Sequence, residues 1–248
     1  MTGTTTSLLV VNPNTTASMT QTIAHAARAA AGQGTAITAA TAAIGPVSIE
    51  GYYDEAFAVP GLLAEIAAGE RSGAQAAIIA CFDDTGLDAA RAMATIPVIG
   101  ICEAALSLAA MVAKRFTVVT TMERSRVPIE ELVDRYGMAR RARVRAANIS
   151  VLSLEDPNSG ARDKLRSEIT RAIAEDNAEA IVLGCAGMAD LARTLGAEFG
   201  MPVIDGVGAA VKQAEALVTL GLTTSKRGAY APPVAKPYAG LFAPFAPA

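Results

Sequence analysis

The amino-acid sequence predicts an α/β fold made of two similar doubly wound parallel-sheet domains, related by pseudo-two-fold symmetry. Three observations support this prediction. Short apolar runs typical of buried strands alternate with helical patterns, which indicates parallel sheets with right-handed crossovers. The composition is 52% hydrophobic but only 4% aromatic, which favours packing by Ala, Val, Ile and Leu. Finally, one strand-and-helix unit occurs twice.

The repeated unit is a buried strand closed by a cysteine, followed by a helix and then by a second strand that opens with Pro-Val-Ile. It spans residues 75–100 in its first copy and residues 179–205 in its second, with Cys81 and Cys185 at matching places. The match predicts that the two halves fold alike and that both cysteines lie at carboxyl ends of central strands, where ligands bind in such sheets.

The first half contains strands, helices and one long loop in a regular order. Thr15, Thr16 or Ser18 can cap the first helix, which Gly32 ends. Pro60 is expected as the first residue of the next helix. The predicted elements are strand 8–11, the helix ending at Gly32, strand 36–42, loop 44–53, helix 60–71, the first cysteine strand, helix 85–93 and strand 98–102.

The second half repeats this order. Its predicted elements are helix 103–114, strand 116–121, helix 128–137, strand 143–149, loop 155–160, helix 161–175, the second cysteine strand with its helix, strand 203–205 and helix 207–220. The proline-rich tail 221–248 is expected to be extended and to wrap the body. The predicted domains are residues 1–103 plus 207–248, and residues 104–206.

The loop 44–53 is too long and irregular for a plain connection. It has Gly45 and Pro46 near its start and two tyrosines at its end. Long irregular connections in compact domains often bind ligands or cover sites. We therefore expect Gly45 and Pro46 to contact a ligand.

Charge and hydropathy exclude several kinds of partner. The net charge is −3 and the sequence pI is near 5.3, which argues against nucleic acid. No apolar run approaches the roughly 18 residues that a membrane span needs. The first residues lack the pattern of a secretory signal, so we expect a cytoplasmic protein, and we expect it to form a homo-oligomer.

Three cysteines with no close pair do not form a disulfide framework. A metal site is not expected, because His25 is the only histidine and has no partner at ligand spacing. Cys102 reads as a core residue near the end of an apolar strand. A redox pair of Cys81 and Cys185 would need both thiols at disulfide distance. Purely structural roles would not explain why the two cysteines occupy matching positions in the two copies of the repeat.

Two thiols facing each other across a cleft suit a racemase without a cofactor. One thiolate removes the proton alpha to a carbonyl, and the other thiol returns a proton to the opposite face of the planar carbanion. Each cysteine is followed by a predicted helix, whose N-terminus should lower the thiol pKa toward neutrality. Fixed hydrogen-bond donors at the strand ends would stabilise the enolate.

The chain resembles the aspartate/glutamate racemase superfamily, and within it the hydantoin and allantoin racemases. The resemblance covers nearly the whole chain and is carried by five segments: residues 12–16, 80–91, 184–188, 221–228 and 236–240. It implies two α/β domains with the site between them, Cys81 and Cys185 as acid/base groups, no cofactor, and a last helix and tail that cross back onto the first domain.

The resemblance also suggests substrate-binding positions. Amino-acid racemases of the superfamily have Asn-Thr after each cysteine, where this chain has Phe82-Asp83 and Ala186-Gly187. We expect these four residues to contact a small cyclic amide of the hydantoin type. The uncharged surroundings of Cys185 favour such a neutral substrate over a dicarboxylate.

Three other positions have two open interpretations each. Asn14 either recognises an amide or only forms the turn after the first strand. Thr120 and Thr121, at the equivalent turn of the second half, have the same two alternatives. Asp83 and Asp84 are expected to cap the helix after Cys81, and their charge would raise the thiol pKa.

Other functions remain open at this point. Maleate isomerases of the superfamily share the two cysteines and begin with a similar Asn-Pro-Asn string, and an amino-acid racemase is a further alternative. A two-lobed small-molecule binding protein without catalysis would have the same architecture, but it gives no reason for the matched cysteines.

Overall fold

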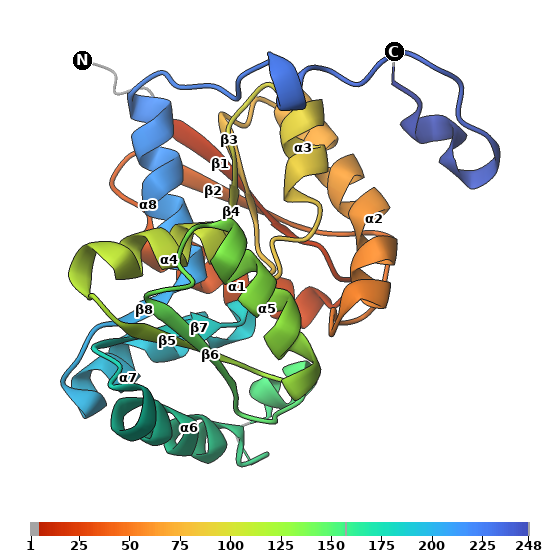
Figure 1. The fold of residues 1–248 in the computed structure, drawn as a ribbon. Helices are drawn as coiled ribbons and strands as arrows, with labels where there is room; N and C mark the ends of the chain where they lie inside the picture. Colours follow the sequence, from red (N-terminus) through yellow and green to blue (C-terminus); the bar gives the residue numbers. More distant parts are fainter. Residues whose placement is uncertain (1–4, 157, 248) are drawn as a thin grey trace.

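The computed structural model describes residues 5–156 and 158–247. Within them the chain forms two parallel four-stranded sheets of identical topology, with strand order β2-β1-β3-β4 in one and β6-β5-β7-β8 in the other (Figure 1). The strands are β1 Thr6–Asn12, β2 Thr35–Thr41, β3 Ala76–Ile79, β4 Val98–Gly100, β5 Phe116–Thr120, β6 Ala142–Ala146, β7 Ala180–Gly184 and β8 Val203–Asp205. The predicted fold class is confirmed.

Helices cover both faces of each sheet. The α-helices are α1 Ala17–Ala30, α2 Tyr52–Arg71, α3 Leu87–Met93, α4 Ile101–Val112, α5 Arg126–Arg135, α6 Ala161–Asp176, α7 Ala192–Phe199 and α8 Gly206–Thr219. Five 3-10 helices complete the described secondary structure: η1 Glu123–Ser125, η2 Val151–Glu155, η3 Ala186–Leu191, η4 Gly228–Tyr230 and η5 Gly240–Phe245.

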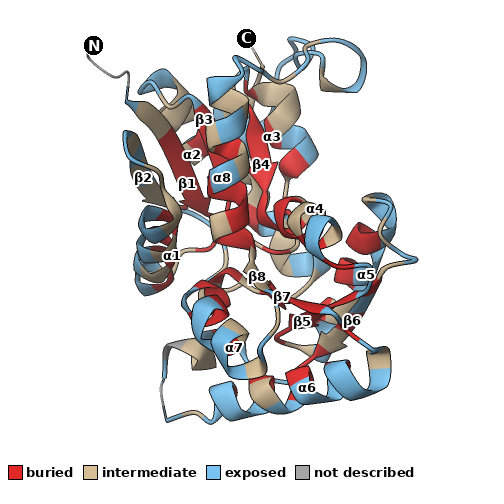
Figure 2. Cartoon of the chain, turned by 90° about the vertical axis from the view of Figure 1, so that its left-hand side faces the viewer, coloured by how far each residue is buried: buried red, intermediate tan, exposed pale blue. Residues whose placement is uncertain are grey.

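The central strands are buried on both faces, as Figure 2 shows. Successive side chains of a strand point to opposite faces. In β1, Leu8 and Val10 therefore pack with α1, α4 and α8, whereas Leu9 and Val11 pack with α2 and α3. The cluster that contains Leu8 also contains Val118 and Val182 of the second sheet. One continuous core thus joins the two halves and holds their strand ends in fixed relation.

Helix α2 differs from the prediction at its start. It begins at Tyr52, inside the segment expected to be a loop, and Pro60 lies within it rather than at its first turn. Asp54 explains the early start, because its carboxylate accepts the backbone N–H of Glu50 at 3.0 Å and, with Glu55, places negative charge in the first turn. A proline inside a helix costs about 3 kcal/mol, which the negative charges of the first turn do not offset by themselves.

The region of Cys102 also differs. The fourth strand ends at Gly100, and Cys102 lies in the first turn of α4, not at the end of a strand. Its side chain is completely buried, so the expected core position is correct although the element is not.

The last helix and the tail contact the first half. Helix α8 packs against α1, α4 and β3. The tail, dark blue in Figure 1, then runs across α3, where Thr224 donates its backbone N–H to the Thr95 carbonyl at 3.2 Å and Tyr230 donates its hydroxyl to Asp88 at 2.9 Å. The domain boundaries at residues 103/104 and 206/207 stay a prediction, and the predicted loop 155–160 includes residue 157, which lies outside the described residues.

None of the helices in the described part of the chain has the length and apolar character that crossing a membrane requires.

Candidate active site

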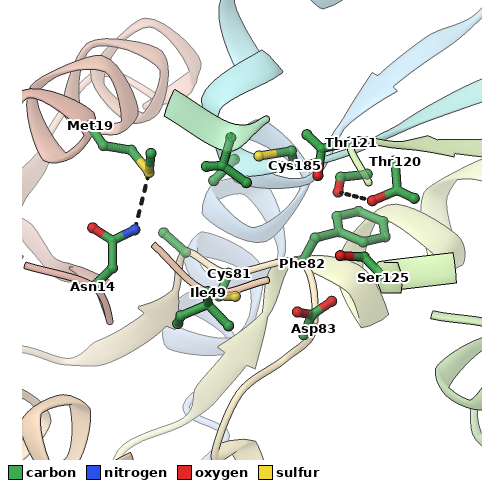
Figure 3. Close-up of a pocket in the computed structure, with 14 residues that line it drawn as sticks. Asn14, Met19, Ile49, Cys81, Phe82, Asp83, Thr120, Thr121, Ser125 and Cys185 are labelled. Carbon is green, nitrogen blue, oxygen red and sulfur yellow. Dashed lines mark hydrogen bonds between the residues drawn. The ribbon is translucent and has the colours of Figure 1, made fainter. Parts of the chain in front are cut away.

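The two halves place their cysteines at one cavity. Strands β3 and β7 occupy the same position in their sheets, each next to the first strand of its half. Cys81 follows the end of β3 by two residues, and Cys185 follows β7 directly. Both thiols enter a cavity of about 40 Å³ from different walls (Figure 3). The strand topology therefore delivers one thiol from each sheet to a shared space.

Close packing at the end of β7 fixes Cys185. A Cβ at Gly184 would lie 3.0 Å from both Cα and Cβ of Thr120, so glycine lets β7 approach β5 closely here. The Thr120 hydroxyl donates to the Gly184 carbonyl at 3.1 Å. Thr121 makes no side-chain hydrogen bond within the described residues, and its hydroxyl remains available to a ligand at the cavity wall.

Most of the predicted site residues line this cavity. They are Asn14, Cys81, Phe82, Asp83, Thr120, Thr121, Cys185 and Ala186. Gly187 instead borders a neighbouring cavity. Gly45 and Pro46 are not among the lining residues. Pro46 packs against the turn after β1, where its carbonyl accepts the backbone N–H of Thr15 at 2.9 Å.

Six lining residues were not predicted: Met19, Ile49, Ala80, Ser125, Val151 and Gly184. Ile49 and Val151 could have been found from the repeat, because each follows the second strand of its half and precedes the next helix. Met19 lies on the buried face of α1, and an apolar residue at such a position is also what core packing requires. Ser125 has no distinguishing sequence signal.

Asn14 shapes the turn after β1 and also lines the cavity. Its side-chain oxygen accepts hydrogen bonds from the Asn12 amide at 2.8 Å and from the Thr16 backbone N–H at 2.9 Å, which shapes the turn after β1. Its amide nitrogen donates to the Met19 sulfur at 3.1 Å (Figure 3). An amide nitrogen has two hydrogens, so one N–H is left for the cavity. Recognition of a substrate by Asn14 stays a prediction.

The expected lowering of the thiol pKa values is wrong. Burial raises the pKa of Cys81 well above its ordinary value, the Asp83 charge adds to this, and a hydrogen bond from the Thr85 hydroxyl at 3.3 Å only partly opposes it. Burial likewise raises the pKa of Cys185 to about 11, against a hydrogen bond from the Gly187 backbone N–H. Helix α3 begins only at Leu87, too far along the chain to stabilise a Cys81 thiolate, because the dipole effect falls off within the first turn.

Asp84 caps a helix, but not the one expected. Its carboxylate accepts the backbone N–H groups of Cys102 at 2.9 Å and Glu103 at 3.0 Å, at the start of α4. It also accepts the Tyr136 hydroxyl of the second half at 2.7 Å. A Cβ at Gly100 would lie 2.3 Å from the Asp84 carboxyl carbon, so only glycine leaves room for this cap. The sheet order brings Asp84 to α4 rather than to the helix that follows it in sequence.

Asp83 faces the cavity and has an unusual affinity for protons. Burial raises its pKa to about 7, and the nearby carboxylates of Glu55 and Asp84 contribute. Below that pH the Asp83 carboxyl is protonated and can donate a hydrogen bond. Above it, its charge opposes ionisation of both thiols.

The other chemical groups that the sequence singled out lie elsewhere. His25 is exposed on α1, and the three cysteines are free thiols. Among the described residues, no group of three or more His, Cys, Asp or Glu side chains is placed to hold a metal ion.

Comparisons with known proteins point to one family. Residues 8–214 match the model of the Asp/Glu/hydantoin racemase family. The chain is 50% identical to a hydantoin racemase of Pseudomonas sp. (strain NS671), covering 95% of each chain, and 51% identical to one of Rhizobium meliloti, covering 93% of this chain and 96% of that one.

Solved structures give the same result. The allantoin racemase from Klebsiella pneumoniae superposes with a TM-score of 0.95 at 47% identity, over 98% of this chain and 99% of that one. The aspartate racemase of Picrophilus torridus, at 12% identity and a TM-score of 0.62 over 89% of this chain and 96% of that one, shares the fold.

Proposed function

Because the chain belongs to the Asp/Glu/hydantoin racemase family, we propose that it racemises 5-substituted hydantoins, allantoin included, by proton transfer between Cys81 and Cys185. The observation that carries this proposal is the cavity itself. Two cysteines at equivalent strand ends of two like sheets enter it from different walls.

The proposed reaction is a balanced transfer of protons. The thiolate of one cysteine takes the proton from C5 of the hydantoin ring, and the electron pair of the C–H bond moves into the adjacent carbonyl to form an enolate. The thiol of the other cysteine then protonates C5 from the opposite face. The enzyme ends with the two protonation states exchanged, which suits it to the opposite enantiomer in the next turnover.

Raised thiol pKa values fit this chemistry in a particular way. A buried thiolate without a cationic neighbour is a strong base, because ionisation is opposed by desolvation. A thiol of high pKa is a correspondingly good partner for a weakly acidic C–H group, although only a fraction is ionised at neutral pH. The rate of proton transfer depends both on the basicity of the thiolate and on the fraction of the thiol that is ionised.

Hydrogen-bond donors for the enolate surround the cavity. They include the second N–H of Asn14, the hydroxyls of Thr121 and Ser125, and the protonated Asp83 carboxyl. Donors fixed in position before the reaction stabilise developing charge without reorganisation. We assign this role to them collectively.

The charge of the cavity favours a neutral ring. Among its described lining residues there is no lysine or arginine, and the one ionisable side chain besides the thiols is Asp83. A dicarboxylate such as maleate, or an amino-acid carboxylate, would lack a cationic partner. We therefore prefer hydantoin racemisation to the maleate isomerase and amino-acid racemase alternatives.

Polarimetry tests the proposed function. Purified enzyme is incubated with single enantiomers of 5-methylhydantoin, 5-butylhydantoin and allantoin, and maleate conversion is followed by absorbance. We expect optical rotation of at least one of the cyclic substrates to decay well above the spontaneous rate. Conversion of maleate with no effect on any hydantoin would contradict the proposal.

A further inference from the structure

A second, larger cavity adjoins the cavity between the thiols. It has a volume of about 440 Å³ and shares Met19 and Val151 with the smaller one. Sites for small organic ligands usually enclose about 300–1,000 Å³, so the space of about 40 Å³ between the thiols is too small to hold a whole substituted hydantoin. Only the reacting part of the ring can lie there, and the rest must extend beyond it.

The larger cavity begins beside Cys185. Gly187 lines it, and the Gly187 backbone N–H is the hydrogen-bond donor to the Cys185 thiol. A Cβ at position 187 would lie 3.8 Å from the Cys185 sulfur and 3.2 Å from Cδ1 of Leu154. Leu154 of η2 thus lies across the glycine from the thiol. A group attached to the carbon that faces Cys185 would meet this wall first.

The walls change from apolar to polar with distance from the thiols. Met19, Val151 and Leu154 are the apolar residues, and the first two separate the cavities. The outer residues are Gln21, Thr22, Arg162 and Asp190, which lie at the protein surface or close to it.

Arg162 and Asp190 form a loose pair at this outer end. Their nearest nitrogen and oxygen atoms are 3.8 Å apart, which is longer than a hydrogen bond. Neither side chain makes a hydrogen bond elsewhere within the described residues. Guanidinium donors and carboxylate acceptors are therefore both available there, with little net charge.

We propose that the larger cavity is the subsite for the C5 substituent, and that it takes a short chain that is apolar next to the ring and ends in a carboxamide or ureido group. Such a group accepts from Arg162 through its carbonyl and donates to Asp190 through its N–H. Leu154 sets the bulk allowed near the ring. This inference rests on the proposed function.

Three substrates separate size from polarity. 5-Methylhydantoin has a minimal substituent, 5-butylhydantoin an apolar chain, and 5-(2-carbamoylethyl)hydantoin a chain of similar length that ends in an amide. The measured quantity is kcat/KM for racemisation of each, expressed as ratios between substrates so that general losses cancel.

Variants of Leu154 test the apolar part. Leu154→Phe fills the cavity, and we expect the ratio of 5-butylhydantoin to 5-methylhydantoin to fall at least tenfold. Leu154→Ala enlarges the cavity. It should therefore raise the ratio of 5-hexylhydantoin, a substrate with a longer apolar chain, to 5-methylhydantoin. Leu152→Phe is the matched control, because Leu152 lies on the same 3-10 helix, is 43% exposed and does not line the cavity.

Variants of the pair test the polar end. Arg162→Met and Asp190→Leu should each lower the ratio of the amide to 5-butylhydantoin by about fivefold, mainly through KM, because each variant lacks the side chain that makes one of the two hydrogen bonds. Circular dichroism spectra and melting temperatures confirm that the variants fold.

The outcomes distinguish the two proposals. A folded wild-type enzyme that racemises neither allantoin nor any of the three hydantoins defeats the proposed function. An active wild-type enzyme whose ratios are unchanged in the Leu154, Arg162 and Asp190 variants defeats only the subsite. A change in the Leu152 control equal to that in Leu154→Phe defeats it as well.

Discussion

The two cysteine corners of the molecule have the same topology but different chemical surroundings. The corner of Cys81 carries Asp83 and Asp84 on its own turn, whereas Cys185 is followed by Ala186 and Gly187 and accepts a backbone N–H. Burial is the main cause that raises the pKa of both thiols. At Cys81 the Asp83 charge is the second contribution and raises the pKa further. At Cys185 the second contribution is the Gly187 hydrogen bond, which lowers the pKa, and the Asp83 charge is smaller. Strand topology thus sets where the thiols lie, and the residues after each thiol set how readily it loses its proton.

This difference matters for a reaction that treats two mirror-related substrates. Each direction of racemisation begins with a different thiolate. The equilibrium between the enantiomers does not depend on the enzyme, but the small thiolate fraction of the resting enzyme can lie on either cysteine. We expect that it lies mainly on Cys185, the corner without its own carboxyls.

The largest expected effect comes from removing either thiol. Cys81→Ser and Cys185→Ser should each lower racemisation by at least a thousandfold, because a serine hydroxyl does not ionise near neutral pH. Abstraction needs only the thiolate on one face. In D2O, each variant should therefore still exchange the C5 proton of one enantiomer, and the two should prefer opposite enantiomers by NMR.

A control and a contradicting result accompany this prediction. Cys102→Ala removes the third thiol, which is buried outside the cavity, and should keep both activities. Spontaneous exchange of the acidic C5 proton is subtracted. Exchange of the same enantiomer by both serine variants would show that the corners do not serve opposite faces.

The second effect is on stability. The Asp83 pKa is about 7 in the folded protein, whereas the ordinary value for an aspartate is 3.8. The Asp83 carboxyl therefore binds its proton more tightly in the folded state than in the unfolded state. Stability therefore falls as pH rises from about 4 to about 7. Asp83→Asn lacks this penalty, and urea unfolding should show a gain on the order of 4 kcal/mol at pH 8 and almost none at pH 4. An equal gain at both pH values would contradict the raised pKa.

The third effect concerns thiol reactivity. Iodoacetamide reacts with thiolates, and the ionised Asp83 carboxylate opposes their formation. At pH 8, Asp83→Asn should speed labelling of Cys81 by about tenfold and that of Cys185 less. Asp88→Asn, on the exposed side of α3, is the matched control. Bound substrate should slow labelling of both cysteines, and equal acceleration of both by Asp83→Asn would remove the distinction between the corners.

Local sequence was sufficient to predict much of this arrangement. The buried strands, the repeat and the positions of Cys81 and Cys185 depend on residues adjacent in the chain. So does the turn at Asn14, where side chain and backbone meet within a few positions. The spacing of apolar residues predicts the strands, and the residue types at turns predict where the strands end.

The remaining features depend on tertiary contacts. Asp84 caps α4 because sheet order places it there, and α2 begins earlier than predicted at a turn where the Asp54 carboxylate accepts the Glu50 backbone N–H. The thiol pKa values depend on burial and on the charges across the cavity, which a helix pattern does not reveal. Ser125 reaches the cavity only through the arrangement of the two sheets.

The smallest expected effect tests how the Cys81 corner is tied to the second half. The Tyr136 hydroxyl donates to the buried Asp84 carboxylate at 2.7 Å, whereas Tyr52, which is largely exposed, donates to Glu131 at 2.8 Å. Removing a buried hydrogen bond to a charged group is destabilising, so Tyr136→Phe should lower the free energy of unfolding by about 1–2 kcal/mol at pH 8.

Tyr52→Phe is the matched control and should change stability little, because water replaces the partner of an exposed group. The Asp84 pKa is raised by burial to about 6. At pH 4.5 its carboxyl is neutral and is a weaker acceptor, so the effect of Tyr136→Phe should shrink there. Loss of stability that is equal in the two tyrosine variants, or independent of pH, would mean that the Cys81 corner is not held through the Asp84 carboxylate. In that case the continuous core between the sheets, rather than this hydrogen bond, would keep the two thiols in register.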